Sequence, residues 1–213
     1  MVDSLAAAAP PRLSSPPPPP ALKMAPNLTE DEVDDLIYFA RAGEQADLAE
    51  ALATLSARES VAPGVILTAA RDESKATCLH MAAGNGNLDV VSAILAHFAQ
   101  LPAEERKAAL DQANEFANTA LHWACLRGHL SVVKALLEAG ASPALANDKD
   151  EIPLDCALFA EKQDVVDHFM GLSRALEGDN GEGGLSSGVG SVEVEVEETK
   201  AEPEAGKSSS SDS

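Results

Sequence analysis

Aromatic side chains are scarce in this chain: Phe, Trp and Tyr make up 3% of its 213 residues, although 45% of the residues are hydrophobic. Large sheets draw heavily on aromatic and β-branched residues. A core built mainly from Ala, Leu and Val therefore favours closely packed helices over a sheet sandwich.

Basic residues are also few, with 15 Lys and Arg against 35 Asp and Glu, a net charge of −20. This balance argues against a direct nucleic-acid binder, which needs a basic surface. It is compatible with simple solubility or with a basic partner. Residues 28–170 alone carry 24 acidic and 10 basic side chains, a net charge of −14, so the acidity is not confined to the tail.

Cysteine is rare too, and Cys78, Cys125 and Cys156 have no CxxC spacing. We expect reduced, buried thiols. No apolar run approaches the roughly 18 residues of a membrane span, and the amino end "MVDSLAAAAPPRLSSPPPPPALKM" has no hydrophobic signal core. These absences predict a cytoplasmic and nuclear protein with no membrane partner.

What the chain does have is an internal repeat. "LHMAAGNGNLDVVSAIL" begins at Leu79 and "LHWACLRGHLSVVKALL" at Leu121, with Leu, His, Ala, Gly and Val-Val at the same offsets. Weaker copies are "LDCALFAEKQDVVDHFM" at Leu154 and "LIYFARAGEQADLAEAL" at Leu36, so the starts lie 43, 42 and 33 residues apart. Each copy reads as a short helix, a turn and an amphipathic helix. Such a hairpin is too small to bury its own apolar face, so it needs neighbours.

A unit of 33 residues with the pattern T-x-L-H-x-A resembles the ankyrin repeat, and "TCLHMA" and "TALHWA" carry that pattern here. The resemblance implies an all-α solenoid of about four repeats with short hairpin turns, spanning residues 28–176. The two longer spacings predict insertions of about ten residues, the second able to form a helix from Pro102 to Ala113. Lys75, Ala117 and Asp150 stand where the family usually has Gly, so we expect those hairpin turns to be distorted or longer than usual.

The two ends of the chain differ in composition from its middle. Residues 1–27 are rich in Ala and Pro, and residues 177–213 are rich in Gly and Ser and then acidic, so we predict that both are disordered. The repeat region opens with "TEDEVDDL", where Thr29 and Glu32 match a capping box and the acids favour the positive end of a helix.

Chemistry-bearing motifs are missing. His80 and His122 recur at one repeat position, where the family's His bonds across the hairpin turns, and no Cys/His cluster has zinc spacing. "AGNGN" at Ala83 lacks the Lys of a P-loop, and no Ser/His/Asp arrangement stands out. We expect neither catalytic, cofactor-binding nor metal-binding residues, and no enzyme.

The family's concave face, lined by the hairpin turns and the first helices, is where a partner is expected. The resemblance places these partner-binding candidates on the turns: Asp72, Glu73, Glu115, Phe116, Asp148, Lys149 and Glu151. On the first helices it places Tyr38, Arg41, Met81, Asn85, Trp123 and Arg127. Apolar anchors among acids suit a basic amphipathic helix. Alternatively, Met81 and Trp123 pack mainly between repeats.

A closer resemblance rests on the opening "LTEDEVDDLIYFARAGE", the long insertion reaching "NEFANTALHWACLRGHLSVVKALL" and the acidic tail. This combination resembles the fungal ankyrin-repeat chaperones of small-subunit ribosomal protein three, a KH-domain RNA binder. The resemblance implies that the chain binds and shields this basic protein before its assembly into pre-ribosomes, as a monomer in a one-to-one complex. The alternative is a generic ankyrin adaptor in signalling or transcription, which would use the same face for a client that is not basic.

Overall fold

The structure is a computed structural model of the chain and describes residues 25–179, with side chains as far as Arg174. The chain divides into two compact units, Met1–Arg174 and Ala175–Ser213, and the described part of the second is the end of helix α10. The ends predicted to be disordered lie outside the described residues except for 25–27 and 177–179.

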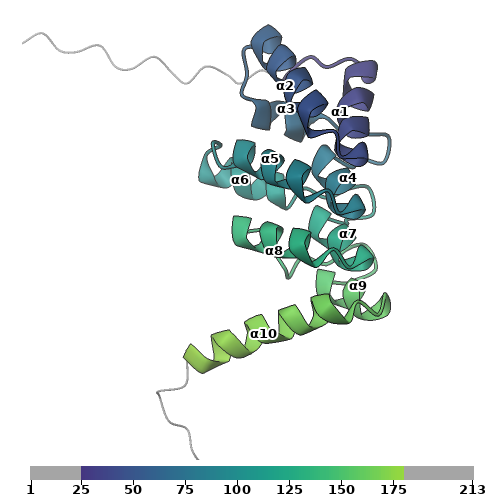
Figure 1. Cartoon of the computed structure of the whole chain (residues 1–213), viewed down its shortest axis with the longest axis vertical. Coiled ribbons are helices and arrows are strands. Elements are labelled where there is room, and N and C mark those ends of the chain that lie inside the picture. Colours follow the sequence, from purple (N-terminus) through teal and green to yellow (C-terminus); the bar gives the residue numbers. More distant parts are fainter. Residues whose placement is uncertain (1–24, 180–213) are drawn as a thin grey trace, which may run out of the picture. The chain divides into compact units, whose positions relative to one another are not determined.

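The described residues form ten helices and no named strand, which confirms the all-α prediction. Four helix pairs correspond to the four sequence copies (Figure 1): α1 (Glu30–Ala42) with α2 (Gln45–Glu59), α4 (Cys78–Asn85) with α5 (Leu88–Phe98), α7 (Ala120–Arg127) with α8 (Leu130–Ala139), and α9 (Pro153–Phe159) with α10 (Gln163–Asp179). In the first three pairs a glycine in the left-handed region ends the first helix, at Gly43, Gly86 and Gly128.

The two insertions are helical. α6 (Ala103–Leu110) is the predicted helix, but it is shorter than the predicted range, because Pro102 is its N-cap and Asp111 its C-cap. The first insertion holds α3 (Pro63–Ala69), which the sequence analysis did not predict; it packs against α2 and α5 and buries Ile66 and Leu67. Both insertions therefore add to the core instead of forming open loops.

Within the first unit, the first helices pack side by side in the order α1, α4, α7, α9, and the second helices in the order α2, α5, α8 (Figure 1). Ala82, Ala124 and Ala157 hold equivalent positions in the last three copies and are all fully buried. Small side chains there let neighbouring first helices approach closely, which explains how a core with few aromatics can close.

His80 and His122 tie each repeat to the next, as the resemblance implied. Nδ1 of His80 accepts the Thr77 N–H (3.2 Å), so in the neutral ring Nε2 carries the proton and donates to the Asn118 carbonyl (3.0 Å). His122 repeats the pattern with the Thr119 N–H and the Glu151 carbonyl. Burial lowers the pKa of His80 to about 4 and also lowers the pKa of His122. Both are structural histidines, neutral at physiological pH.

The first helix begins with the predicted capping box: Thr29 Oγ1 accepts the Glu32 N–H, and Glu32 Oε2 accepts the Thr29 N–H. Arg58 of α2 pairs with Glu32 and with Glu59. Asn27 joins this cluster, since its N–H donates to Glu59 and its carbonyl accepts from Arg58. Folded structure thus begins one residue before the predicted boundary at Leu28.

Candidate functional site

Three hairpin turns, which we call fingers, precede α4, α7 and α9 at residues 72–76, 114–118 and 147–151. The prediction that they are distorted or longer is wrong. Lys75, Ala117 and Asp150 adopt the left-handed region with φ of 61°, 57° and 60°, and all three turns close with the same pair of backbone hydrogen bonds. The residues that stand in place of the family's usual glycine therefore keep the same turn. Each does so at a conformational cost of about 1–2 kcal/mol for the left-handed backbone.

Side chains at the start of each finger stabilise this shape. Asp72, Asn114 and Asn147 occupy the same position, and one side-chain oxygen of each accepts backbone or hydroxyl hydrogens from within its own turn at 2.8–3.0 Å. Asn114 and Asn147 are both buried to 7% exposure. These bonds offset the strain of the left-handed residue.

Neighbouring fingers are bonded to one another through the backbone. The Glu115 N–H donates to the Ser74 carbonyl (2.9 Å), and the Asp148 N–H donates to the Phe116 carbonyl (3.2 Å). These two bonds fix the spacing of the finger tips, so the side chains on them form an ordered row.

The candidate acids on the fingers separate into two kinds. Glu73, Glu115 and Asp148 are exposed and free to meet a partner. Asp72 and Glu151 are half-buried and serve the turns, because Asp72 bonds the Ala76 N–H and Glu151 accepts the Asn147 amide (3.1 Å). The exposed acidic row therefore contains three of the five predicted acids.

Of the apolar candidates, Phe116 lies on the second finger, whereas Tyr38, Met81 and Trp123 lie on the first helices. Tyr38 is 58% exposed and Phe116 51%, whereas Met81 and Trp123 are half-buried. Trp123 lies over Gly84, where an added Cβ would come within 2.7 Å of its ring, and it meets His80 edge-on at 5.9 Å. Trp123 thus packs between repeats while keeping part of its surface open.

Two apolar residues escaped the sequence analysis: Leu126 is 48% exposed and Phe159 is 75% exposed. Both fall five residues after the first Leu of their repeat, the position held by Arg41 and Gly84 in the earlier copies. Comparing that position across the four copies would have found them. Tyr38, Met81, Trp123, Leu126 and Phe159 together form what we call the apolar floor.

The first helices end at an edge opposite the fingers. The remaining candidates Arg41, Asn85 and Arg127 are exposed there, in the last turns of α1, α4 and α7. A hollow of about 550 Å³ opens at this edge, lined by Gly84, Asn85, Leu126, Arg127, His129, Ala160 and Lys162. It shares Leu126 with the apolar floor. The candidates from the sequence thus lie on the fingers and along the first helices, and among them Asp72 and Glu151 mainly stabilise the turns.

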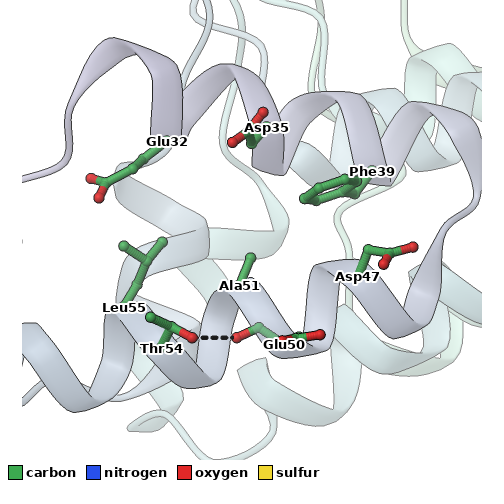
Figure 2. A pocket seen from close by; sticks show the side chains of 8 residues that line it. All are labelled: Glu32, Asp35, Phe39, Asp47, Glu50, Ala51, Thr54 and Leu55. Atoms are coloured by element: carbon green, nitrogen blue, oxygen red, sulfur yellow. Dashed lines mark hydrogen bonds between the residues drawn. The ribbon is translucent and has the colours of Figure 1, made fainter.

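A second hollow, of about 320 Å³, lies between α1 and α2, where Figure 2 shows the side chains of one helix facing those of the other. Phe39, Ala51, Thr54 and Leu55 line it together with the carboxylates of Glu32, Asp35, Asp47 and Glu50. The Arg58 guanidinium, aided by the Thr29 N–H, lowers the pKa of Glu32 to about 2. The sequence analysis linked the α1 acids to the helix end alone, so this hollow was not predicted.

The described residues supply no obvious reactive centre. Cys78, Cys125 and Cys156 are free and buried, as expected, and burial raises the pKa of Cys78 and Cys125 to about 12. Among residues 25–174 no three His, Cys, Asp or Glu side chains gather in a way that could hold a metal ion. No helix in the described part is long and apolar enough to cross a bilayer.

The comparisons with known proteins agree with this architecture. The sequence matches the ankyrin-repeat family, as three repeat copies, over residues 36–145 and 100–173, so the chain belongs to that family. It also belongs to the same family as a particular yeast protein: it is 35% identical over 169 residues to "Ankyrin repeat-containing protein YAR1" of Saccharomyces cerevisiae, covering 78% of this chain and 82% of the yeast protein.

Two further comparisons extend this result. The chain is 34% identical over 139 residues to "Ankyrin repeat-containing protein P16F5.05c" of Schizosaccharomyces pombe, covering 65% of this chain and 84% of that protein. Its structure matches a chain in the crystal structure of the yeast ribosomal protein Rps3 in complex with its chaperone Yar1. That match has a TM-score of 0.63 and 35% identity and covers 68% of this chain and 94% of the other.

Proposed function

We propose that this protein is a dedicated chaperone that binds small-subunit ribosomal protein three, Rps3, and shields it before its assembly into pre-ribosomes. One observation carries the proposal: the chain matches 94% of a chain from the complex of yeast Rps3 with its chaperone Yar1, at 35% identity. The net charge of −14 over residues 28–170 supports it, because a free ribosomal protein exposes basic RNA-binding segments.

The proposed binding surface is the face between the fingers and the opposite edge. The apolar floor supplies buried area and thus affinity, with Trp123 and Tyr38 as aromatic anchors. Glu73, Glu115 and Asp148 form the exposed acidic row that attracts the client and disfavours other partners. Because hydrogen bonds between fingers hold this row in place, little ordering is needed on binding.

The ankyrin-repeat family is not an enzyme family, and we propose that the chain acts by binding alone, without cofactor or direct nucleic-acid contact. Shielding before assembly requires one chaperone for each client, so we propose a one-to-one complex. Because ribosomal proteins are made in the cytoplasm and assembled in the nucleus, we place the chain in both compartments.

The proposal is tested by measuring the affinity of purified Rps3 for the wild type and for the triple variant Glu73→Lys/Glu115→Lys/Asp148→Lys at several salt concentrations. Each exposed charge pair contributes about 0.2–1 kcal/mol, so we expect the triple variant to bind roughly 3- to 100-fold more weakly, with a smaller salt dependence.

The control is Asp35→Lys/Asp47→Lys/Glu50→Lys, which makes the same charge change in the hollow between α1 and α2. If only the control variant binds Rps3 more weakly, the client binds at that hollow and not at the fingers. If the wild type neither binds Rps3 nor keeps it soluble at physiological salt, the chaperone proposal fails. Capture of a client that is not basic would then favour the generic adaptor.

A further inference from the structure

The edge opposite the fingers contains a basic hollow next to an acidic one, in which Glu161 and Asp164 lie around Lys162. The basic hollow, of about 550 Å³, is lined by the side chains of Arg127, His129 and Lys162, and no carboxylate is among its lining residues. This is unexpected in a region with 24 acids and 10 bases. Within the described residues, no ion pair involves Arg127 or Lys162.

The hollow is shaped by residues that follow the inter-helix turns. The His129 imidazole lies over Gly86, and its Nε2 donates to the Gly84 carbonyl (3.2 Å). The stem of Lys162 lies over Gly128, within 2.7 Å of where a Cβ would stand. Lys162 lines the hollow together with the exposed Arg127.

The first helices are about as long as an α-helix is wide. α4 and α7 each begin at a finger and end at the opposite edge after 8 residues, which is about 12 Å of helix. An α-helix with its side chains is about 10–12 Å across. A helix lying on the apolar floor would therefore meet acids along one side and bases along the other.

We propose that the client segment bound on this face is an amphipathic helix with basic side chains along one edge and acidic side chains along the other, and that Arg127 and Lys162 bind the acidic edge. This inference rests on the proposed chaperone function and deepens it. The opposite charges on the two sides fix the direction in which the helix runs. Reversing it end for end, with its apolar face still on the floor, would bring like charges together on both sides. The sequence analysis expected a basic helix only.

The test is whether making this face more negative strengthens or weakens client binding. The variant Arg127→Glu/Lys162→Met makes the face more negative while keeping an apolar stem over Gly128. A purely basic client segment should bind this variant more tightly. An acidic edge on the client predicts the opposite, and we expect affinity for purified Rps3 to fall roughly tenfold or more. The matched control Lys134→Glu/Arg174→Met changes net charge equally at exposed sites on α8 and α10, and should bind within about twofold of the wild type or more tightly.

The outcomes are separable. Weaker binding of the Arg127/Lys162 variant, with normal melting temperature and an unaffected control, supports the acidic edge. Unchanged or tighter binding overturns it, and if the finger variant still loses affinity, the chaperone proposal stands without it. If the wild type fails to bind Rps3, the proposed function and this inference fall together. Arg127→Gln is a milder check, for which a smaller loss in the same direction is expected.

Discussion

Acid should loosen the stack of repeats through His80. The side chain is 1% exposed, and its pKa is lowered to about 4 by burial, against 6.5 for a free histidine. Between these two pH values the unfolded chain binds more protons than the folded one. The contribution of neutral His80 to stability is therefore fully present above pH 6.5 and is lost as the pH falls toward 4. Protonation would also put a hydrogen on Nδ1, which faces the Thr77 N–H.

The expected size follows from the two pKa values. Lowering the pH from 7.5 to 5.0 should cost about 2 kcal/mol of unfolding free energy through His80 alone. For a unit of this length that corresponds to a melting temperature about 4–8 °C lower. His122 shifts in the same direction and adds to the loss.

The assay is urea unfolding of wild type and His80→Gln at pH steps between 7.5 and 5.0. Gln at this position preserves a Thr-x-x-Gln capping box with Thr77 but cannot be protonated. The variant should start about 1 kcal/mol less stable, for the altered bond to Asn118, and should lose less stability than the wild type on acidification. Carboxylates titrate equally in both proteins and cancel in the difference. Parallel curves for the two proteins would refute the reasoning.

Four further substitutions test packing, helix propensity, turn conformation and helix capping. Gly84→Ala should destabilise the fold by about 1–3 kcal/mol, because the added Cβ would lie 2.7 Å from the Trp123 ring. Gly171→Ala in α10, where nothing lies within 4 Å of the added Cβ, should stabilise the fold by up to about 1 kcal/mol. Thermal melts of both variants separate the effect of the clash from that of helix propensity. Ala117→Gly should stabilise by about 1 kcal/mol, since Ala117 has φ of 57°; chemical denaturation giving a loss instead would contradict this account of the finger. Thr29→Ala should cost about 0.5–2 kcal/mol by removing the cap of α1, and an unchanged urea midpoint would argue against the capping box.

Much of the fold follows from short-range signals that the sequence carries openly. Leu-His-x-Ala in two copies, and the turn glycine and the Val-Val pair in three each, located all four helix pairs, because equivalent positions have the same structural role. α3 was missed, since seven residues are too few to show a helical period, and it depends on contacts with α2 and α5. The finger turns were misjudged because the pattern of φ angles survives without glycine when Asn or Asp holds the turn.

The site was harder to predict, for a reason that Asp72 and Glu73 illustrate. Adjacent in sequence and alike in charge, one carboxylate bonds the Ala76 N–H while the other is exposed, and only the backbone path decides which. The basic hollow shows the same limit, because Arg127 and Lys162 come from successive repeats and are 35 residues apart. Their spacing in the sequence does not reveal that they line one cavity, because α8 and the third finger lie between them along the chain.

Stability and recognition are coupled in this design. The His122 ring bonds the carbonyl of Glu151, the last residue of the third finger, and the Asp148 N–H of that finger bonds Phe116 of the second. The bonds that join one repeat to the next are therefore the bonds that set the spacing of the exposed acids. A client that contacts several fingers at once would in turn oppose the separation of the repeats, because binding to the folded form alone stabilises it. We infer that acidification, which weakens the histidine bonds, lowers client affinity as well as stability.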